Sequence, residues 1–215
     1  YGEACDYLER EIRKLGVDIH LNAAVTEVEL DSRKPDAVIL ATGSVPFVPP
    51  IQGLSGGGAV LVDDVLEGRA PVGRRVAIIG GGAIGAETAH LLVEEEDREV
   101  YLIEMRDGIA VDLPQDARIC LLHAFEQTPS LHQITNAKVT AVTPESITLE
   151  RQGQTEVVDR LDTIILAVGA RPNQGLRPAL EALGIPFLVS GDATGPKDYV
   201  KAIYEGFVAG NTIAE

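Results

Sequence analysis

The sequence predicts an α/β protein built on a parallel sheet, and three segments carry this prediction. Residues 37–43 (AVILATG) are a continuous apolar run of the kind that parallel sheets bury on both faces, and residues 162–169 (DTIILAVG) echo it as a second apolar strand that ends in a small residue and Gly. Residues 74–105 read in order as strand, glycine-rich turn, helix and strand. Strands that alternate with helices are typical of parallel sheets, so the three segments agree.

The N-terminal part is predicted to hold a helix and two short strands. Apolar residues at helical spacing predict a helix over residues 3–15, and Gly16 follows as its C-terminal stop. Residues 17–30 (VDIHLNAAVTEVEL) read as one strand and a second, short strand. Residues 45–58 are rich in proline and glycine, and they predict a linker-like loop.

The C-terminal half is predicted to mix helices with a small antiparallel meander. A helix is expected over residues 115–127. Residues 137–166 read as a β-meander of four strands, the last of them in the apolar run that begins at Asp162. Residues 185–215 read as strand, turn and helix.

The charge and composition limit the partners of this chain. It carries 18 Lys and Arg against 33 Asp and Glu, a net charge of −15, so we expect it to bind neither nucleic acid nor an anionic membrane surface. No apolar run reaches the ~18 residues that a transmembrane helix needs. Cys5 and Cys120 lie far apart and form no metal-ligand or dithiol pattern, which predicts free thiols in a reducing cytoplasm.

The strongest chemical signal is the run GGGAIG at residues 80–85, which follows a predicted strand directly and opens a helix. A glycine at its first position permits the tight turn, at its third it lets a pyrophosphate approach the backbone, and at its last it lets helix and strand pack closely. The backbone N–H groups and the helix dipole would then hold the pyrophosphate. We therefore predict a Rossmann-like dinucleotide site at Gly80, Gly82, Ala83, Ile84 and Gly85.

Two side chains after the next predicted strand bear on which dinucleotide is bound. Glu104 lies 19 residues after Gly85, where such folds place an acid that binds the adenosine ribose hydroxyls, and this favours NAD(H). A 2′-phosphate next to this carboxylate would meet a like charge. Arg106 could turn outward and accept that phosphate, so NADP(H) stays open.

Four motifs in fixed order give the chain a resemblance to a known family. They read ATGSVPFVPPIQG, VAIIGGGAIGAETA, AVGARPN and GDATGPKDYVKAIYEGFVAG. With them, over about residues 5–213, the chain resembles the two-dinucleotide-domain flavoprotein reductases. Within these it is most similar to the C-terminal FAD/NAD(P)-binding module of the NADH:flavin oxidoreductases related to 2,4-dienoyl-CoA reductase and 2-enoate reductase.

The resemblance implies further binding residues and a division into lobes. Residues 67–168 would form the NAD(P)-binding lobe with its parallel sheet and meander, inserted in a truncated FAD-binding lobe of residues 1–66 and 169–215. Positions matching the family's cofactor contacts are Ala41, Thr42 and Gly43 against FAD, Gly191 and Asp192 at the flavin ribityl chain, and Gly169 and Glu87 near the nicotinamide.

The resemblance also implies that part of the machinery lies outside this chain. The family's first GxGxxG unit is missing, and the chain starts at Tyr1 rather than Met, so we expect a C-terminal piece that is inactive alone. The catalytic flavin barrel of the same polypeptide, with FMN and an iron–sulfur cluster, would lie upstream. The truncated lobe would expose apolar surface, which predicts a tendency to form a homodimer.

The implied activity is hydride transfer from NAD(P)H to FAD, with an enoate, enoyl-CoA or flavin acceptor. The cofactors carry that step, so we assign no catalytic side chain and no metal site. One alternative is a nucleotide-binding or docking domain without catalysis. Another is a flavoprotein like the ferredoxin and rubredoxin reductases. A disulfide reductase is disfavoured because the sequence has no paired cysteines.

Overall fold

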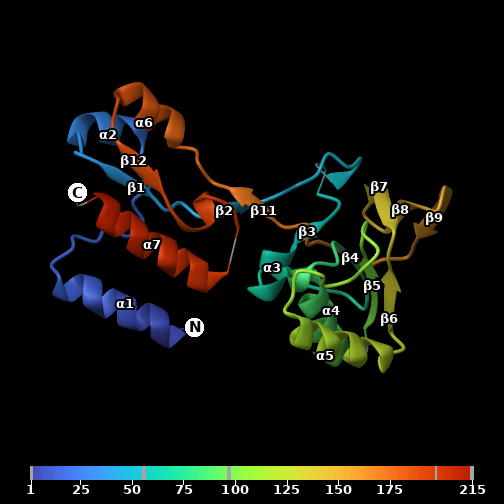
Figure 1. Cartoon of the computed structure of the whole chain (residues 1–215). Helices are drawn as coiled ribbons and strands as arrows, with labels where there is room; N and C mark the ends of the chain where they lie inside the picture. Colours follow the sequence, from blue (N-terminus) through green and yellow to red (C-terminus); the bar gives the residue numbers. More distant parts are fainter. Residues whose placement is uncertain (1, 55–56, 96–97, 197, 214–215) are drawn as a thin grey trace. The chain divides into compact units, whose positions relative to one another are not determined.

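The structure is a computed structural model that describes residues 2–54, 57–95, 98–196 and 198–213 (Figure 1). The chain forms two compact units. Unit 1 comprises Tyr1–Ala41, Gln174–Ser190 and Tyr199–Glu215, and unit 2 comprises Thr42–Asn173 and Gly191–Asp198. Residues 42–66 thus group with the predicted NAD(P) lobe by their contacts, while the lobe boundaries drawn from cofactor binding stay a prediction.

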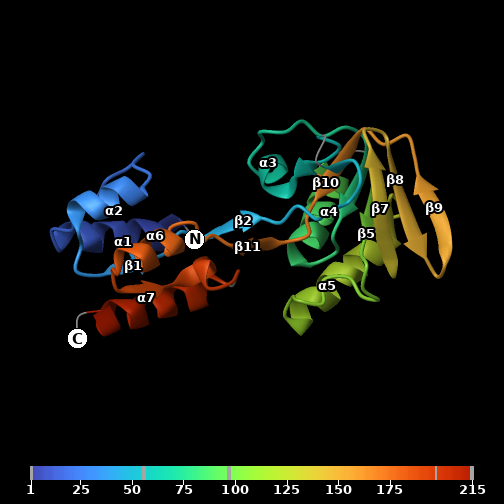
Figure 2. The same cartoon turned by 90° about the horizontal axis from the view of Figure 1, so that it is seen from above.

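Unit 2 is built on a five-stranded parallel sheet, which confirms the predicted α/β class (Figure 2). Strands β4 and β10 are neighbours in the sheet although they lie far apart in the sequence, and the other three strands flank this pair. In spatial order the strands are β3 (Val60–Leu61), β10 (Thr163–Leu166), β4 (Arg75–Ile79), β5 (Glu99–Ile103) and β6 (Leu131–Ile134).

Side chains alternate between the two faces of this sheet, and each face has its own core. Val76 and Ile78 of β4 pack with the buried side chains of the helices, among them Ala86 of α4 and Phe125 of α5. A short helix, α3, adds Val62 to the same core. The helices on this face are α3 (Val62–Leu66), α4 (Ala83–Glu95) and α5 (Gln115–Glu126), of which α5 confirms the helix predicted at 115–127.

The other face of the sheet is covered by an antiparallel meander. Ala77 and Ile79 of β4 share a core with Ile147 and Leu149 of the meander. Its strands are β7 (Ala137–Thr143), β8 (Ser146–Arg151) and β9 (Gln154–Val158).

The strand predicted as the fourth of the meander exists, but its predicted position is wrong. This strand, β10, belongs to the parallel sheet, where it pairs with β3 and β4. All four residues of β10 are buried, which suits a central strand with a covered face on each side.

A short antiparallel pair completes the regular structure of unit 2. Strand β2 (Ser44–Pro46) pairs with β11 (Ala170–Pro172), and the 3₁₀ turn η2 (Gly191–Ala193) contacts β11. Strand β2 therefore interrupts the segment 45–58 that was predicted to be a linker-like loop.

Unit 1 holds a two-stranded parallel sheet of β1 (Val38–Leu40) and β12 (Phe187–Val189). The strands predicted within residues 17–30 are wrong: residues 17–26 form no strand, and helix α2 (Glu27–Arg33) follows. Thr26 caps this helix, because its side chain accepts a hydrogen bond from the Glu29 backbone and Glu29 accepts one from the Thr26 backbone in return. The other helices are α1 (Gly2–Lys14), α6 (Arg177–Leu183) and α7 (Tyr199–Ile213).

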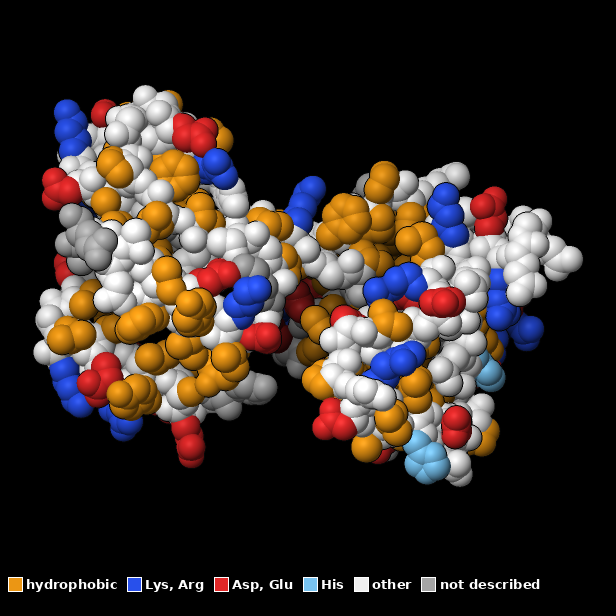
Figure 3. Space-filling model, in the orientation of Figure 1, with side chains coloured by type: hydrophobic (Ala, Val, Ile, Leu, Met, Phe, Trp, Pro, Cys, Tyr) orange, Lys and Arg blue, Asp and Glu red, His pale blue; other side chains and the backbone are white. Residues whose placement is uncertain are grey.

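The helices of unit 1 expose large apolar side chains. Helix α1 buries none of its residues and α7 buries only Ala209. Phe207 is 70% exposed and Tyr204 65% exposed, and Figure 3 shows hydrophobic side chains in orange over this unit. The expected apolar surface is therefore present, while the homodimer stays a prediction. Among the described residues, no helix is both long and apolar enough to cross a bilayer.

Candidate functional site

The glycine-rich turn sits at the carboxyl end of β4, where three backbone segments meet. Gly80 adopts φ 109°, and a Cβ there would lie 2.4 Å from the carbonyl oxygen of Ala167, just after β10. A Cβ on Gly85 would lie 2.0 Å from the carbonyl oxygen of Gly80. Real Cβ atoms do not approach so closely. Glycine is therefore required at position 80 by its positive φ and by the backbone after β10, and at position 85 by the packing of α4 on the turn.

The turn is more open at Gly82. The three atoms nearest to a Cβ there would all belong to the Asp112 carboxyl group, with Oδ2 at 3.2 Å. Ala83 is partly exposed and the side chain of Ile84 is 51% exposed at the start of α4. The side of the turn that a ligand could approach is therefore Gly82–Ile84, where the helix begins.

Glu104 lies just after β5 and is almost fully buried, with 7% of its surface exposed. Its Oε2 accepts a hydrogen bond from the Gly81 backbone at 2.8 Å, and its Oε1 accepts from the Arg106 backbone at 2.8 Å. Burial raises the pKa of Glu104, but the hydrogen bonds from the Arg106 and Gly81 backbones and from the Arg106 side chain outweigh it, so the pKa lies below its ordinary value of 4.5. The residue predicted to bind the ribose therefore also ties the glycine turn to β5.

Arg106 lies against this carboxylate rather than turning outward. Its Nε donates to Oε1 of Glu104 at 3.1 Å, while its side chain remains 51% exposed. A ribose at Glu104 would thus lie near both a carboxylate and a guanidinium. The carboxylate favours NAD(H), whereas the guanidinium favours the 2′-phosphate of NADP(H).

A loop between β5 and α5 lies across the glycine turn. The Ala110 backbone, at φ 51°, donates to the carbonyl oxygen of Gly81 at 2.7 Å. Oδ1 of Asp112 accepts a hydrogen bond from the backbone N–H of Ala83 at 2.9 Å. An aspartate carboxylate therefore sits where helix α4 begins, and sequence reasoning missed it because the contact joins residues 29 positions apart through a loop.

The predicted flavin-side residues of unit 2 gather around β11. The Thr42 hydroxyl donates to the carbonyl oxygen of Asn173, and the Asn173 backbone donates to Gly43 at 2.9 Å. Ser44 donates from its hydroxyl to Oδ2 of Asp192, the residue after Gly191, at 3.3 Å. Asn173 was not predicted as a site residue, although its motif AVGARPN was recognised.

The three remaining predicted residues are solvent-exposed. Gly169 follows β10 at φ 89°, and a Cβ there would meet nothing within 4 Å. Glu87 points to solvent from the first half of α4. Ala41 follows β1 and belongs to unit 1.

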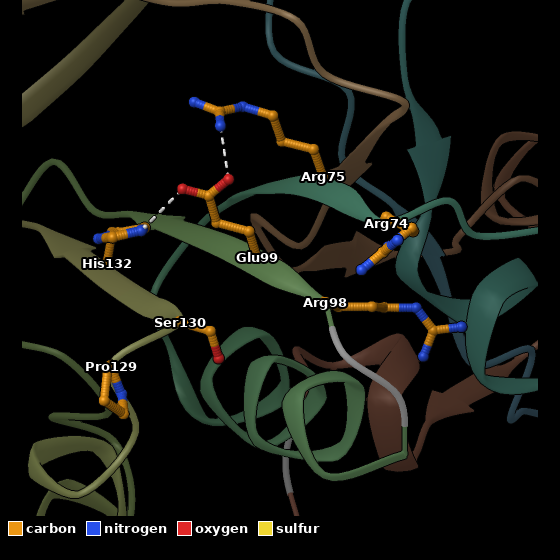
Figure 4. A pocket seen from close by; sticks show the side chains of 7 residues that line it. All are labelled: Arg74, Arg75, Arg98, Glu99, Pro129, Ser130 and His132. Carbon is orange, nitrogen blue, oxygen red and sulfur yellow. Dashed lines mark hydrogen bonds and ion pairs between the residues drawn. The ribbon is translucent and has the colours of Figure 1, made fainter.

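A separate hollow of about 470 Å³ lies at the amino-terminal ends of β4 and β5, at the other end of these strands from the glycine turn (Figure 4). In it Glu99 binds Nη1 of Arg75 at 2.5 Å and Nε2 of His132 at 3.1 Å. The Tyr101 hydroxyl also donates to Glu99, and this bond contributes most to lowering the pKa of Glu99. Ligands of open parallel sheets bind at the carboxyl ends of the strands, so this hollow is not the dinucleotide site. Its lining is Arg74, Arg75, Arg98, Glu99, Pro129, Ser130 and His132.

The comparison with protein families decides where this turn belongs. The family model described as "Pyridine nucleotide-disulphide oxidoreductase" matches residues 31–195, well over half of the chain. The chain belongs to this family. The match includes the glycine turn, Glu104 and the segment around Gly169.

Curated relatives in this family are longer than the chain. It is 35% identical over 211 residues to a bilirubin reductase of Mediterraneibacter gnavus, covering 98% of this chain and 32% of that protein. It is 31% identical over 208 residues to an NADH oxidase of Thermoanaerobacter brockii, covering 94% of the chain and 32% of that protein. The chain thus spans about a third of the length of these relatives.

Among solved structures, a 2-naphthoyl-CoA reductase in complex with 2-naphthoyl-CoA superposes with a TM-score of 0.83 at 26% identity. The match covers 97% of this chain and 32% of that one. The chain therefore has the Rossmann-like fold of that reductase. A FAD-dependent pyridine nucleotide-disulphide oxidoreductase of Desulfovibrio vulgaris, 24% identical with a TM-score of 0.61, shares this fold. In the part of the chain that the structure describes, no three His, Cys, Asp or Glu side chains are gathered for a metal ion.

Proposed function

We propose that the chain is the nicotinamide- and flavin-dinucleotide-binding module of a larger oxidoreductase that passes a hydride from NAD(P)H to FAD. The observation that carries this proposal is the glycine turn of Gly80–Gly85, which lies between a buried strand and a helix in a chain of this family. NAD(P)H supplies the hydride when bound, and the residues of this chain hold and orient it.

The residues present fit a dinucleotide. The backbone at Gly82 carries no side chain where the first turn of α4 begins, so a pyrophosphate can reach the N–H groups of that turn when the Asp112 carboxylate leaves Ala83. The carboxylate of Glu104 already holds three donors, and a carboxylate has about four acceptor positions, so one is left for a ribose hydroxyl. Gly169 presents open backbone at the neighbouring strand end, where we place the nicotinamide.

At a finer level, we assign the chain to the NADH:flavin oxidoreductases related to 2,4-dienoyl-CoA and 2-enoate reductases. A cinnamate reductase of Clostridium sporogenes is 28% identical over 213 residues, which supports an unsaturated acid as the acceptor. The likeness to the 2-naphthoyl-CoA reductase supports a CoA thioester as the alternative acceptor. The acceptor would bind to an upstream flavin barrel of the same polypeptide, outside the segment that this chain shares with its relatives.

Thermal unfolding with NADH and with NADPH tests the binding part of this proposal. A ligand at ~100 times its Kd stabilises the folded state by ~2.7 kcal/mol, which raises the Tm of a chain of this size by about 5–10 °C. We expect NADH to give the larger rise, because Glu104 opposes a 2′-phosphate. Equal rises would assign the phosphate to Arg106.

A pair of glycine variants provides the control. Gly82→Val should abolish the rise in Tm, because its side chain fills the approach to the α4 N-terminus. Gly210→Val introduces the same side chain in α7, where a Cβ would meet nothing within 4 Å. This variant should keep the rise in Tm. If wild type shows no rise with either nucleotide, the chain is a docking domain without a working site and the proposal is wrong.

A further inference from the structure

We propose that Asp112 competes with the pyrophosphate for the N-terminus of α4 and so keeps the affinity of this site for dinucleotides low. The inference rests on the proposed function, since it concerns the same glycine turn. It assigns to Asp112 a role in setting cofactor affinity, which the sequence pattern did not indicate.

The position of the carboxylate is the first observation. Oδ1 of Asp112 accepts from the Ala83 backbone at 2.9 Å, and Oδ2 lies 3.2 Å from the point where a Cβ on Gly82 would be. These are the N–H of the first helical residue and the open glycine that the proposed pyrophosphate would use. The carboxylate is thus an anion of the protein itself, bound in the place of the ligand's anion.

The second observation is that the loop is anchored independently of Asp112. Ile109 is 3% exposed, and its carbonyl oxygen accepts from Nε of Arg118 at 2.8 Å. The Ala110 backbone donates to Gly81 at 2.7 Å. Because these contacts hold the loop on the turn, the carboxylate stays close to the turn even when its bond to Ala83 breaks.

Both responses to an incoming dinucleotide weaken its binding. If the carboxylate is displaced, its charge-assisted hydrogen bond to the helix N-terminus is lost. If it stays, it repels the two negative charges of the pyrophosphate at short range. Asp112→Asn removes the charge and keeps an oxygen that can accept from Ala83, so it should favour the ligand without disturbing the loop.

The test compares the Kd of NADH, by titration calorimetry, for wild type, Asp112→Asn and Asp107→Asn. Asp107 is an exposed acid of the same loop, so its variant changes the net charge equally without touching the turn. We expect Asp112→Asn to bind about 10-fold more tightly, or ~1.4 kcal/mol, and Asp107→Asn to match wild type. The gain in affinity of Asp112→Asn over wild type should also appear with ADP, which carries the pyrophosphate, and should be absent with adenosine, which lacks it. High salt should reduce this gain.

The outcomes separate this inference from the proposed function. If wild type binds NADH and Asp112→Asn binds it equally or more weakly, the inference is overturned while the proposed function stands. If no variant binds NADH, both fall. Asp112→Ser, with a short neutral hydroxyl, is the second variant in case the amide disturbs the loop, and it should show the same direction of change.

Discussion

Replacing Gly85 by alanine is expected to lower the free energy of unfolding by about 3 kcal/mol, the upper end of what overpacking usually costs. The added Cβ would lie 2.0 Å from the carbonyl oxygen of Gly80 and 3.2 Å from the Cβ of Ala167. The first of these is backbone, so helix α4 has to move away from β4 and β10 to make room. For a chain of this size, the loss corresponds to a Tm about 6–12 °C lower.

Chemical denaturation followed by circular dichroism measures this loss, and Gly206→Ala is the matched control. Gly206 lies within α7, where a Cβ would meet nothing within 4 Å. The same substitution there should leave stability unchanged or raise it by about 0.5–1 kcal/mol, because alanine favours the helix. Equal stability of the two variants would show that α4 does not pack on the turn as described.

The second large effect is expected for Glu104→Gln, which should lower the free energy of unfolding by about 2–3 kcal/mol near neutral pH. This is the size of a hydrogen bond to a charged group. The carboxylate accepts from the backbones of Gly81 and Arg106 and from the Arg106 side chain. An amide of the same shape offers one oxygen and turns its NH₂ group toward one of these donors. Affinity for NADH should fall as well, because the ribose loses its ionised acceptor.

The pH dependence gives this prediction a sign. The pKa of Glu104 in the folded chain lies below its ordinary value of 4.5, so its ionised form stabilises the fold above about pH 4.5. That contribution is lost as the pH falls through the folded-state pKa. Urea unfolding at several pH values should therefore show wild type and Glu104→Gln converging below pH 4.5, whereas a constant difference would contradict the role of the charge.

The parts of the fold that the sequence predicts are those set by local pattern. The run from β4 through α4 to β5 is recognisable because its strands are mostly apolar and its turn needs glycines at fixed places. The helix of residues 115–127 follows from spacing alone. Each of these signals lies within one short stretch of the chain, and each describes an interaction that forms within that stretch or beside it.

Other features depend on partners far away in the chain. Residues 17–30 alternate like a strand, but no described strand pairs with them, and the Thr26–Glu29 capping box sets up a helix instead. That capping signal was present in the sequence. The contact between Asp112 and Ala83 has no such signal in the sequence, because it depends on the left-handed turn at Ala110 and on a loop that folds back over Gly81.

The place of β10 in the parallel sheet has a consequence for synthesis on the ribosome. Strand β3 is at the edge of the sheet, and among the described strands it pairs with β10 alone, which also pairs with β4. A nascent chain therefore completes helices α3 to α5 and its whole meander before the strand that joins β3 to the rest of the sheet exists. Until then β4 keeps an unpaired edge open to strand exchange with other chains, so co-translational chaperone binding should be strongest just before residue 163 emerges.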